Sequence, residues 1–422
     1  MIIYDLIVIG GGISGLYTNY NYLKENKDKK TLLLERNSNL GGRINTIKYK
    51  SRYIFESGAG RFSEKHTYLI NLIKELKLNN KCIKIDNVKD IILHPKDIYK
   101  KHFKKYKNMD NIIKILIKEI SKRSKTFQNS IHKYNLLELA DILLKDNVSK
   151  FMEDIYPYYS ELSVMNAYDA LELFKSDFNS KTKFYILSGG LYQIIKILET
   201  KIKKLKGNIK TDIELKYITK EKELYCVNKL FYCKKIVLAI PKPALNKIIK
   251  LKTNNILLPL KKYINTVKGE PLYRIYVKYK TPCWFKDIDK FSTNLPIKFF
   301  IPYNKDTGLV MVSYTDGKYA RYWFNILKKG EKHFEKEINK QLKLLFPSIN
   351  IPKYEWMSHH FWDEGVYYWK KGYKGKELEK KIFNCLKKET NENIYLCGEC
   401  YSSKQAWIEG GLNTSQLVLK NI

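Results

Sequence analysis

Short apolar runs and a glycine cluster organise the start of the chain. The run from Tyr4 to Ile9 ends in glycines, and a second apolar run covers Thr31 to Leu34. Runs of this kind are typical of parallel strands that are buried on both faces. Residues from about Ser14 to Lys24 lie between the two runs and have helical spacing. The pattern therefore predicts a βαβ unit.

Helical periodicity then dominates residues 62–185. Ser63 is placed to cap a helix, and the periodicity returns at 110–121 and 135–145. A later helix is predicted to open at Gly189-Gly190 and to close at Gly207. The apolar face of the helix after Ser63 is Leu69, Ile70, Ile73 and Leu76. The apolar face of the helix after Gly190 is Leu191, Ile194, Ile195, Leu198, Ile202 and Leu205.

Strands are the main prediction for the rest of the chain. A meander that returns into the parallel sheet is predicted from Ile209–Ile218, Leu224–Val227 and Ile236–Ile240. Residues 263–325 alternate aromatic and polar positions like a mixed sheet, 331–346 is a predicted helix, and 394–422 is predicted as strand, loop and helix. No internal repeat or long linker separates these segments, so we predict an α/β fold, with α+β character, built from interleaved domains.

The composition is that of a folded chain. Of the 422 residues, 44% are hydrophobic and 14% aromatic, which is far from the composition of a disordered protein. Every apolar stretch is shorter than the ~18–20 residues that a membrane helix needs, and Leu6 to Gly12 is too short for the core of a signal peptide. We therefore expect a cytoplasmic protein that does not contact a membrane.

Lysine accounts for most of the positive charge. The chain has 78 Lys and Arg against 43 Asp and Glu, a net charge of +35, and seven of the 78 are arginine. Asn and Ile are also abundant, as an AT-rich coding sequence would produce, and the lysines are spread along the whole chain instead of forming one basic block. This distribution predicts weak, non-specific binding of polyanions and not a dedicated nucleic-acid site. Whether the chain is a monomer or a homodimer stays open.

The cysteines and histidines do not indicate a metal site. Seven cysteines in a chain without secretory features favour reduced thiols. Cys397 and Cys400 form one CxxC, but a zinc site would need further ligands. The tandem His359-His360 also lacks metal-ligand spacing with carboxylates. We expect no bound metal.

A phosphate-binding loop is predicted between the first strand and the first helix. Gly10, Gly12 and Gly15 form GxGxxG in GGGISG, and Glu35 ends the next strand 20 residues past Gly15. The first glycine permits the turn, the second lets the backbone approach a pyrophosphate, and the third lets the helix pack on the strand. Glu35 can accept hydrogen bonds from a ribose. The sequence therefore predicts a dinucleotide site.

The residues after Glu35 favour FAD over NAD. Gly41-Gly42-Arg43 forms a second glycine loop, and its arginine would offset the pyrophosphate charge of a longer dinucleotide. A surface turn with a solvated arginine is the alternative. Because arginine is scarce in this lysine-rich chain, its presence at position 43 favours the cofactor role.

Together these blocks resemble the flavin-containing amine oxidases, the group that holds monoamine, polyamine and L-amino-acid oxidases. The similarity runs from Tyr4 to the last helix. The matching blocks are GGGISG, LLLER ending at Arg36, GGR, ESGAGRF at 56–62, SGGLYQI at 188–194, KIVLAIP at 235–241 and CGECYSSKQAWIEGGL at 397–412.

The resemblance implies roles for further residues. Gly398 and Glu399 would bind the ribityl-pyrophosphate region, Leu215 would lie against the adenine, and the backbone around Trp407 and Ile408 would reach the isoalloxazine. Val366 stands where monoamine oxidases place the cysteine that tethers FAD, which implies a non-covalent flavin. The predicted cofactor-binding residues are Gly10, Gly12, Ile13, Ser14, Gly15, Glu35, Arg36, Gly42, Arg43, Leu215, Trp362, Gly398, Glu399, Trp407 and Ile408.

The same resemblance divides the chain into domains. A Rossmann-type FAD-binding domain is expected from 1–60, 186–262 and 390–422. A substrate-binding domain of mixed sheet and helices is expected from 61–185 and 263–389.

Three side chains would carry the substrate chemistry by resemblance. Trp407 and Tyr367 fall at the positions of two rings that flank an amine before the flavin, where they can steer its lone pair and exclude water. Arg61 lies in GAGRFSEKH, which is similar to the block of L-amino-acid oxidases whose arginine grips the substrate carboxylate. An arginine that supports the flavin or a helix N-terminus is the alternative.

Arg274 departs from the family pattern. It occupies the position where the family usually has a lysine, bonded through water to flavin N5 and credited with helping oxygen reoxidise the flavin. Arginine keeps the charge but is bulkier and does not lose its proton. A dehydrogenase with another electron acceptor is therefore an alternative to an oxidase.

The expected reaction is oxidative deamination of an L-amino acid or an amine. A hydride would pass from the α-carbon to flavin N5 and give an imine, with hydrogen peroxide formed where oxygen is the acceptor. A monoamine or polyamine oxidase is the rival within the family. A flavin desaturase or isomerase of hydrophobic substrates, and a basic flavoprotein with a binding or packaging role, are alternatives from other classes.

Overall fold

The chain folds into two compact units. The computed structural model describes residues 2–88, 90–177 and 181–422, apart from the side chains of 252–254. The first unit comprises residues 1–85, 182–268 and 374–422, and the second comprises 86–181 and 269–373. Each unit is therefore assembled from separate stretches of the chain, and the fold is a mixture of helices and sheets, as predicted. Residues 61–85, 182–185, 263–268 and 374–389 lie in the first unit, whereas the sequence-based boundaries gave them to the substrate-binding domain.

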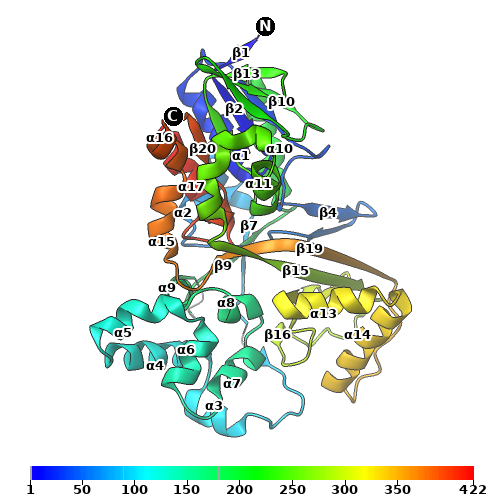
Figure 1. Ribbon diagram of the computed structural model, residues 1–422. Helices are drawn as coiled ribbons and strands as arrows, with labels where there is room; N and C mark the ends of the chain where they lie inside the picture. The colour runs from blue at the N-terminus through cyan, green and yellow to red at the C-terminus, as the bar shows by residue number, and fades with distance from the viewer. Residues whose placement is uncertain (1, 89, 178–180) are drawn as a thin grey trace. The chain divides into compact units, whose positions relative to one another are not determined.

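A five-stranded parallel sheet forms the core of the first unit (Figure 1). Its strands, in spatial order, are β10 (Asn208–Lys210), β3 (Thr31–Leu34), β2 (Leu6–Ile9), β14 (Ile236–Leu238) and β20 (Ile394–Leu396). This is the strand order of a doubly wound dinucleotide-binding sheet. All residues of β2, β3, β14 and β20 are buried, so the apolar runs form buried parallel strands, as predicted.

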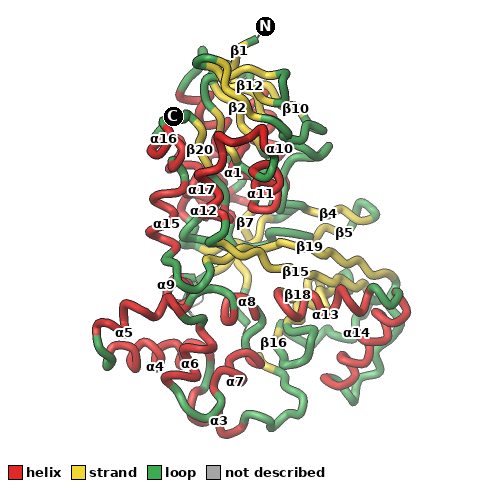
Figure 2. Tube along the Cα trace, viewed as in Figure 1, coloured by secondary structure: helices red, strands yellow, loops and turns green. Residues whose placement is uncertain are grey.

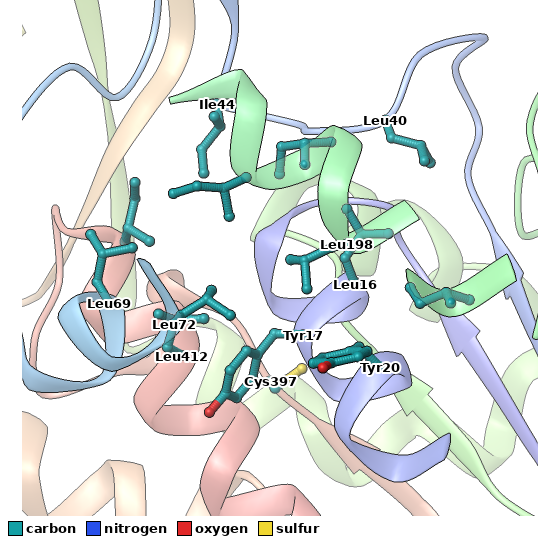
Figure 3. Packing of buried hydrophobic residues seen from close by; sticks show 14 of the residues in the cluster. Leu16, Tyr17, Tyr20, Leu40, Ile44, Leu69, Leu72, Leu198, Cys397 and Leu412 are labelled. Atoms are coloured by element: carbon teal, nitrogen blue, oxygen red, sulfur yellow. The ribbon is translucent and has the colours of Figure 1, made fainter. Parts of the chain in front are cut away.

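Four helices pack around a shared apolar cluster of this unit. They are α1 (Ile13–Glu25), α2 (Thr67–Glu75), α10 (Tyr192–Lys204) and α17 (Ile408–Leu419). Leu16, Leu72, Leu198 and Leu412 bring one leucine from each helix into the cluster, as Figure 3 shows. The predicted inward face of α10 is confirmed for Leu191, Ile194, Ile195, Leu198 and Ile202, which are fully buried, whereas Leu205 is partly buried.

Smaller sheets complete the first unit. One contains β1 (Ile3–Tyr4), β13 (Phe231–Cys233), β12 (Leu224–Val227) and β11 (Ile218–Glu221). A hairpin joins β4 (Thr46–Tyr49) to β5 (Tyr53–Glu56), and a three-stranded antiparallel sheet has the order β6 (Phe62–Ser63), β9 (Phe184–Leu187) and β7 (Cys82–Ile85). The remaining helices are α11 (Lys242–Ile249), α12 (Lys261–Ile264), α15 (Gly375–Ile382) and α16 (Cys385–Thr390), with short 3₁₀ turns such as η4 (Glu399–Tyr401).

Two predicted strands are each divided in the structure. The run Tyr4–Ile9 breaks at Asp5, because Tyr4 pairs with β13 while residues 6–9 pair with β3 and β14. The run Ile209–Ile218 breaks after β10, where Asp212 adopts a left-handed φ of 59°. In both places the chain leaves one sheet and enters another, which an apolar run alone does not reveal.

The helix start predicted at Ser63 is wrong. Ser63 belongs to β6, and α2 begins four residues later with His66 as its N-cap residue. The Ser63 hydroxyl accepts a hydrogen bond from the Lys65 amide at 3.1 Å and does not reach the helix. The helix is capped instead by the carboxylate of Glu409, which comes from α17.

A six-stranded sheet and two groups of helices make up the second unit (Figure 2). The strand order is β19 (Trp356–Trp369), β15 (Val267–Lys278), β18 (Leu309–Asp316), β17 (Phe299–Asn304), β16 (Phe291–Ser292) and β8 (Asp90–Ile91). The helices are α3 (Lys100–Tyr106), α4 (Met109–Ser121), α5 (Lys125–Ser130), α6 (Leu136–Leu143), α7 (Val148–Ile155), α8 (Tyr159–Ser163), α9 (Ala167–Ser176), α13 (Gly317–Leu327) and α14 (Glu331–Leu345). The mixed sheet predicted at 263–325 is thus confirmed between Val267 and Asp316, whereas residues 263–264 belong to α12 and α13 follows Asp316.

Two general properties follow from the described residues. Among the helices that the structure describes, none is both long and apolar enough to cross a membrane. All seven cysteines carry free thiols.

Candidate functional site

Gly10 and Gly15 are required by protein packing. Gly10 has a φ of 109°, and a Cβ atom there would lie 2.4 Å from the carbonyl oxygen of Ala239 in the loop after β14. A Cβ atom at Gly15 would lie 1.9 Å from the Gly10 carbonyl oxygen. These two glycines therefore let the turn form and let α1 pack on the sheet.

Gly12 is different, because the protein itself does not require a glycine there. Its φ of −74° suits any residue, and a Cβ atom would meet no atom of the described residues within 4 Å. Gly12 is also the N-cap of α1, so the open space lies at the start of a helix that points its first amides there. Gly41 pairs with Gly12 as an isolated bridge, so the second glycine loop lies beside the first.

Glu35 is buried and fastens the glycine loop. Its carboxylate accepts hydrogen bonds from the Gly11 amide at 2.7 Å and from the Asn37 amide at 2.9 Å. Each oxygen has a second lone pair, so the predicted role toward a ribose stays chemically open. Arg36 is exposed, and Leu215 is buried in the segment that follows β10.

Arg43 and Glu399 form an ion pair, with 2.7 Å between guanidinium and carboxylate. The sequence suggested each of them separately as a cofactor residue. Glu399 also accepts a hydrogen bond from the Ala406 amide, and Gly398 donates its amide to the Thr414 hydroxyl at 2.9 Å. Glu399 therefore links the GGR loop to the loop that leads into Trp407. Like Gly12, Gly398 has room for a Cβ atom among the described residues, with a φ of 137°.

The residues present fit a bound dinucleotide. The glycine loop leaves open space at the N-terminus of α1, and Arg43 supplies a cation nearby. An open approach, helix amides and an arginine are what a pyrophosphate needs. Gly12, the first turn of α1, Arg43 and Glu35 are therefore the residues that would hold FAD.

Arg61 lies in a cluster with three ring side chains, which we call the Trp407 cluster: Arg61, His66, Phe184 and Trp407. The guanidinium carbon lies 4.6 Å from the ring centre of Phe184 and 5.8 Å from that of Trp407. The rings of Phe184 and Trp407 stack at 6.0 Å, and His66 meets Trp407 edge-on at 4.7 Å. Sequence reasoning named Arg61 and Trp407 but missed the other two. The motif GAGRFSEKH, which ends at His66, contained the available signal.

Arg274, Tyr367 and Trp362 belong to the second unit. Arg274 on β15 is buried, faces Tyr314 across the sheet, and places its guanidinium carbon 4.4 Å from the centre of that ring. Tyr367 and Trp362 both lie on β19, and Tyr367 is fully buried. Their roles toward the flavin and the substrate stay predictions.

The tandem histidines and the CxxC cysteines lie in surroundings that do not favour a reactive role. Burial lowers the pKa of His360 to about 4, and His359 lies 3.1 Å from the Tyr273 hydroxyl. Burial raises the pKa of the Cys397 thiol to about 11 and also raises that of Cys400, which disfavours reactive thiolates. Within residues 2–88, 90–177 and 181–422, no group of three His, Cys, Asp or Glu side chains could hold a metal ion.

The parallel sheet, its strand order and the glycine loop define a dinucleotide-binding protein of the doubly wound class. The chain belongs to the flavin-containing amine oxidoreductases, because the model of that family matches residues 13–418. Proteins of this family depend on FAD, so the chain is an FAD-dependent oxidoreductase. The expected family and cofactor are thereby confirmed.

Individual relatives show similarity over short stretches. An uncharacterized protein of Acanthamoeba polyphaga mimivirus is 32% identical over 78 residues, which is 18% of this chain and 15% of that protein. Coproporphyrinogen III oxidase of Bacillus subtilis is 37% identical over 79 residues, which is 18% of this chain and 17% of that protein. The matches therefore span about a sixth of the curated relatives' own length.

One solved structure is similar over the whole chain. A putative protoporphyrinogen oxidase from an Exiguobacterium species matches with a TM-score of 0.71 and 14% identity, covering 100% of this chain and 98% of the other. At this identity the likeness establishes the fold.

Proposed function

We propose that this chain oxidises an L-amino acid or a related amine with FAD, and that Arg61 binds the carboxylate of the substrate. The observation that carries the proposal is the position of Arg61 against Phe184 and Trp407. When bound, FAD supplies the hydride acceptor that turns the C–N bond of an amine into an imine.

The Trp407 cluster has the chemistry to orient such a substrate. Over an aromatic face, a guanidinium presents its in-plane N–H groups to a partner, and a carboxylate matches that fork with two parallel hydrogen bonds. Trp407 and Phe184 supply apolar surface, which excludes water and strengthens the charged pair. Arg61 would thus fix the carboxylate, while Trp407 would flank the amine.

A porphyrinogen is the second candidate substrate. Two of the similar proteins are named as coproporphyrinogen and protoporphyrinogen oxidases. Porphyrinogens also carry carboxylates, so Arg61 would suit either substrate class. Porphyrinogens and amino acids differ in the bond that is oxidised and in the size of the molecule.

Anaerobic reduction of the flavin separates the candidates. The panel contains L-amino acids, the amines formed from them by decarboxylation, and coproporphyrinogen III. Loss of the oxidised flavin absorbance with amino acids supports the proposal. Reduction by the porphyrinogen alone would contradict the proposal and assign a porphyrinogen substrate. Reduction by amines alone would assign a monoamine or polyamine substrate.

Arg61→Met tests the carboxylate contact directly. We expect KM for amino acids to rise by roughly 10–1000-fold, because a partly desolvated charge-assisted pair is lost, while the decarboxylated amines keep their KM. Arg52→Met is the matched control, because Arg52 also lies over a ring, that of Tyr53, but is exposed on the β4–β5 hairpin. Equal losses on both substrate types in Arg61→Met would mean that this arginine is structural.

A further inference from the structure

Glu409 is a fully buried carboxylate in the first turn of α17. It accepts hydrogen bonds from the amides of Tyr68 at 3.1 Å and Leu69 at 3.0 Å, and from the Thr67 hydroxyl at 3.4 Å. All three donors belong to the first turn of α2. The Lys404 ammonium also lies 3.5 Å from it. A side chain of α17 therefore caps another helix.

The start of α2 depends on this carboxylate. The first amides of a helix need partners from outside it, and a negative charge there also interacts favourably with the helix dipole. The N-cap residue His66 uses its Nδ1 to accept from the Ser63 amide at 3.2 Å and so does not cap α2 itself. Glu409 supplies the missing acceptors.

Both ends of this link carry members of the Trp407 cluster. Trp407 is the N-cap residue of α17, two positions before Glu409. His66 is the N-cap residue of α2, and Arg61 precedes it on the same segment. The ring of His66 packs against that of Trp407 at 4.7 Å. Glu409 therefore joins the two helix starts that carry His66 and Trp407.

We propose that Glu409 is a positioning residue that holds the Arg61–His66 segment against Trp407 and so sets the affinity of the cluster for a carboxylate. The part that concerns the carboxylate rests on the proposed function of Arg61. The link between the two helix starts stands on the contacts alone, and the two parts can be tested separately.

Amide hydrogen exchange of the FAD-loaded protein tests the link. Glu409→Gln keeps the shape of the side chain but removes its charge. We expect the peptides covering 61–69 and 402–409 both to exchange faster, by on the order of 10-fold, because a charge-assisted cap is lost. Unchanged exchange in either peptide would overturn the link. If Glu409→Gln does not fold, Glu409→Asp, which keeps the charge on a shorter side chain, is measured with the same two outcomes.

Glu75→Gln is the matched control for α2. Glu75 fastens the other end of the same helix to α1, accepting from the Tyr20 hydroxyl at 2.8 Å and the Lys24 ammonium at 2.7 Å. In this variant the peptides 61–69 and 402–409 should exchange as in wild type. Equal acceleration in both variants would show that any loosening of α2 has this effect, and would overturn the specific role of Glu409.

Benzoate, a carboxylate without an oxidisable amine, tests the effect on affinity. Its binding is followed through the flavin absorbance spectrum at equal flavin content. We expect the dissociation constant for benzoate to be about 10-fold higher in Glu409→Gln than in wild type, and to be the same in Glu75→Gln as in wild type. Equal affinity in Glu409→Gln and wild type would overturn the positioning role. Absence of benzoate binding in wild type would instead contradict the proposed function of Arg61, while hydrogen exchange still decides the link.

Discussion

The guanidinium of Arg43 and the carboxylate of Glu399 lie 2.7 Å apart, although they come from the first and the last segment of the first unit. Arg43 follows the second glycine loop, and Glu399 follows β20. The pair connects the glycine loop that lies beside Gly12 to the loop that leads into Trp407. The guanidinium of Arg43, which would offset the charge of a phosphate, is thus held in place by the carboxylate of Glu399.

Arg43→Met should weaken FAD binding. We expect the dissociation constant for FAD to rise by roughly 10–100-fold, because the phosphate loses a charged partner and Glu399 keeps an uncompensated charge near it. The measurement is quenching of FAD fluorescence in titrations of apoprotein. Lys247→Met, which removes the exposed pair with Glu214, should leave the dissociation constant unchanged. Unchanged affinity in Arg43→Met would remove this arginine from the cofactor site.

Gly12 and Gly15 should respond differently to alanine. In Gly12→Ala the new methyl group enters open space, so the melting temperature of the apoprotein should fall by about 5 °C or less while flavin content falls strongly. In Gly15→Ala the methyl group would lie 1.9 Å from a backbone oxygen, so the apoprotein itself should be destabilised by at least about 3 kcal/mol. Thermal melts and flavin absorbance check both. Full flavin content in Gly12→Ala would contradict the placement of the pyrophosphate.

Arg274 should limit the reaction of the reduced flavin with oxygen. The side chain is buried and stacked on Tyr314, so it keeps a positive charge without lysine's ability to release a proton. We expect slow reoxidation in wild type, faster reoxidation in Arg274→Lys and the slowest in Arg274→Met. Stopped-flow absorbance of photoreduced protein mixed with oxygenated buffer measures these rates. Equal rates in wild type and Arg274→Lys would show that arginine serves as well as lysine, and an equally fast Arg274→Met would separate this residue from the flavin.

Asp316 should give the second unit a pH-dependent stability. Burial raises the pKa of this carboxyl from 3.8 to about 6, although the amides of Tyr159 and Ser160 donate to it. The folded state therefore binds the proton more tightly than the unfolded state. The stabilisation is fully present below about pH 4 and is lost as the pH rises through about 6.

Asp316→Asn should remove this pH dependence. A shift of this size corresponds to about 3 kcal/mol, so the free-energy difference between wild type and variant should change by up to that amount between about pH 4 and pH 7. The wild type should be favoured most at the acidic end. Urea unfolding at several pH values measures the difference, with the largely exposed Asp289→Asn as control. A difference that stays constant with pH would contradict the raised pKa.

Local patterns were sufficient to predict the elements whose partners lie close in sequence. The strand Thr31–Leu34 and the helix α1 follow directly from a buried apolar run and from helical spacing after glycines. The glycine loop could be assigned because its three glycines, strand and helix are contiguous. These features depend on backbone geometry that a short segment fixes by itself.

Long-range partners explain what sequence reasoning missed. The cap of α2 comes from Glu409 and not from Ser63, because a buried carboxylate on another helix replaces the local hydroxyl. Phe184 joins the Trp407 cluster through pairing of β9 with β6, where it stands opposite Ser63. Neither contact has a signature within a window of the chain. The placement of Tyr367 and Arg274 toward a flavin depends in the same way on distant segments and stays a prediction.

The segmented first unit has a consequence for how this protein is made. Synthesis runs from the N-terminus, so the glycine loop leaves the ribosome long before residues 394–412. Until those residues appear, β14 lacks its neighbour β20, Arg43 lacks Glu399, and α2 lacks its cap. The nascent chain therefore holds an incomplete cofactor site with an open strand edge, and FAD can be bound fully only after residues 394–412 have been made.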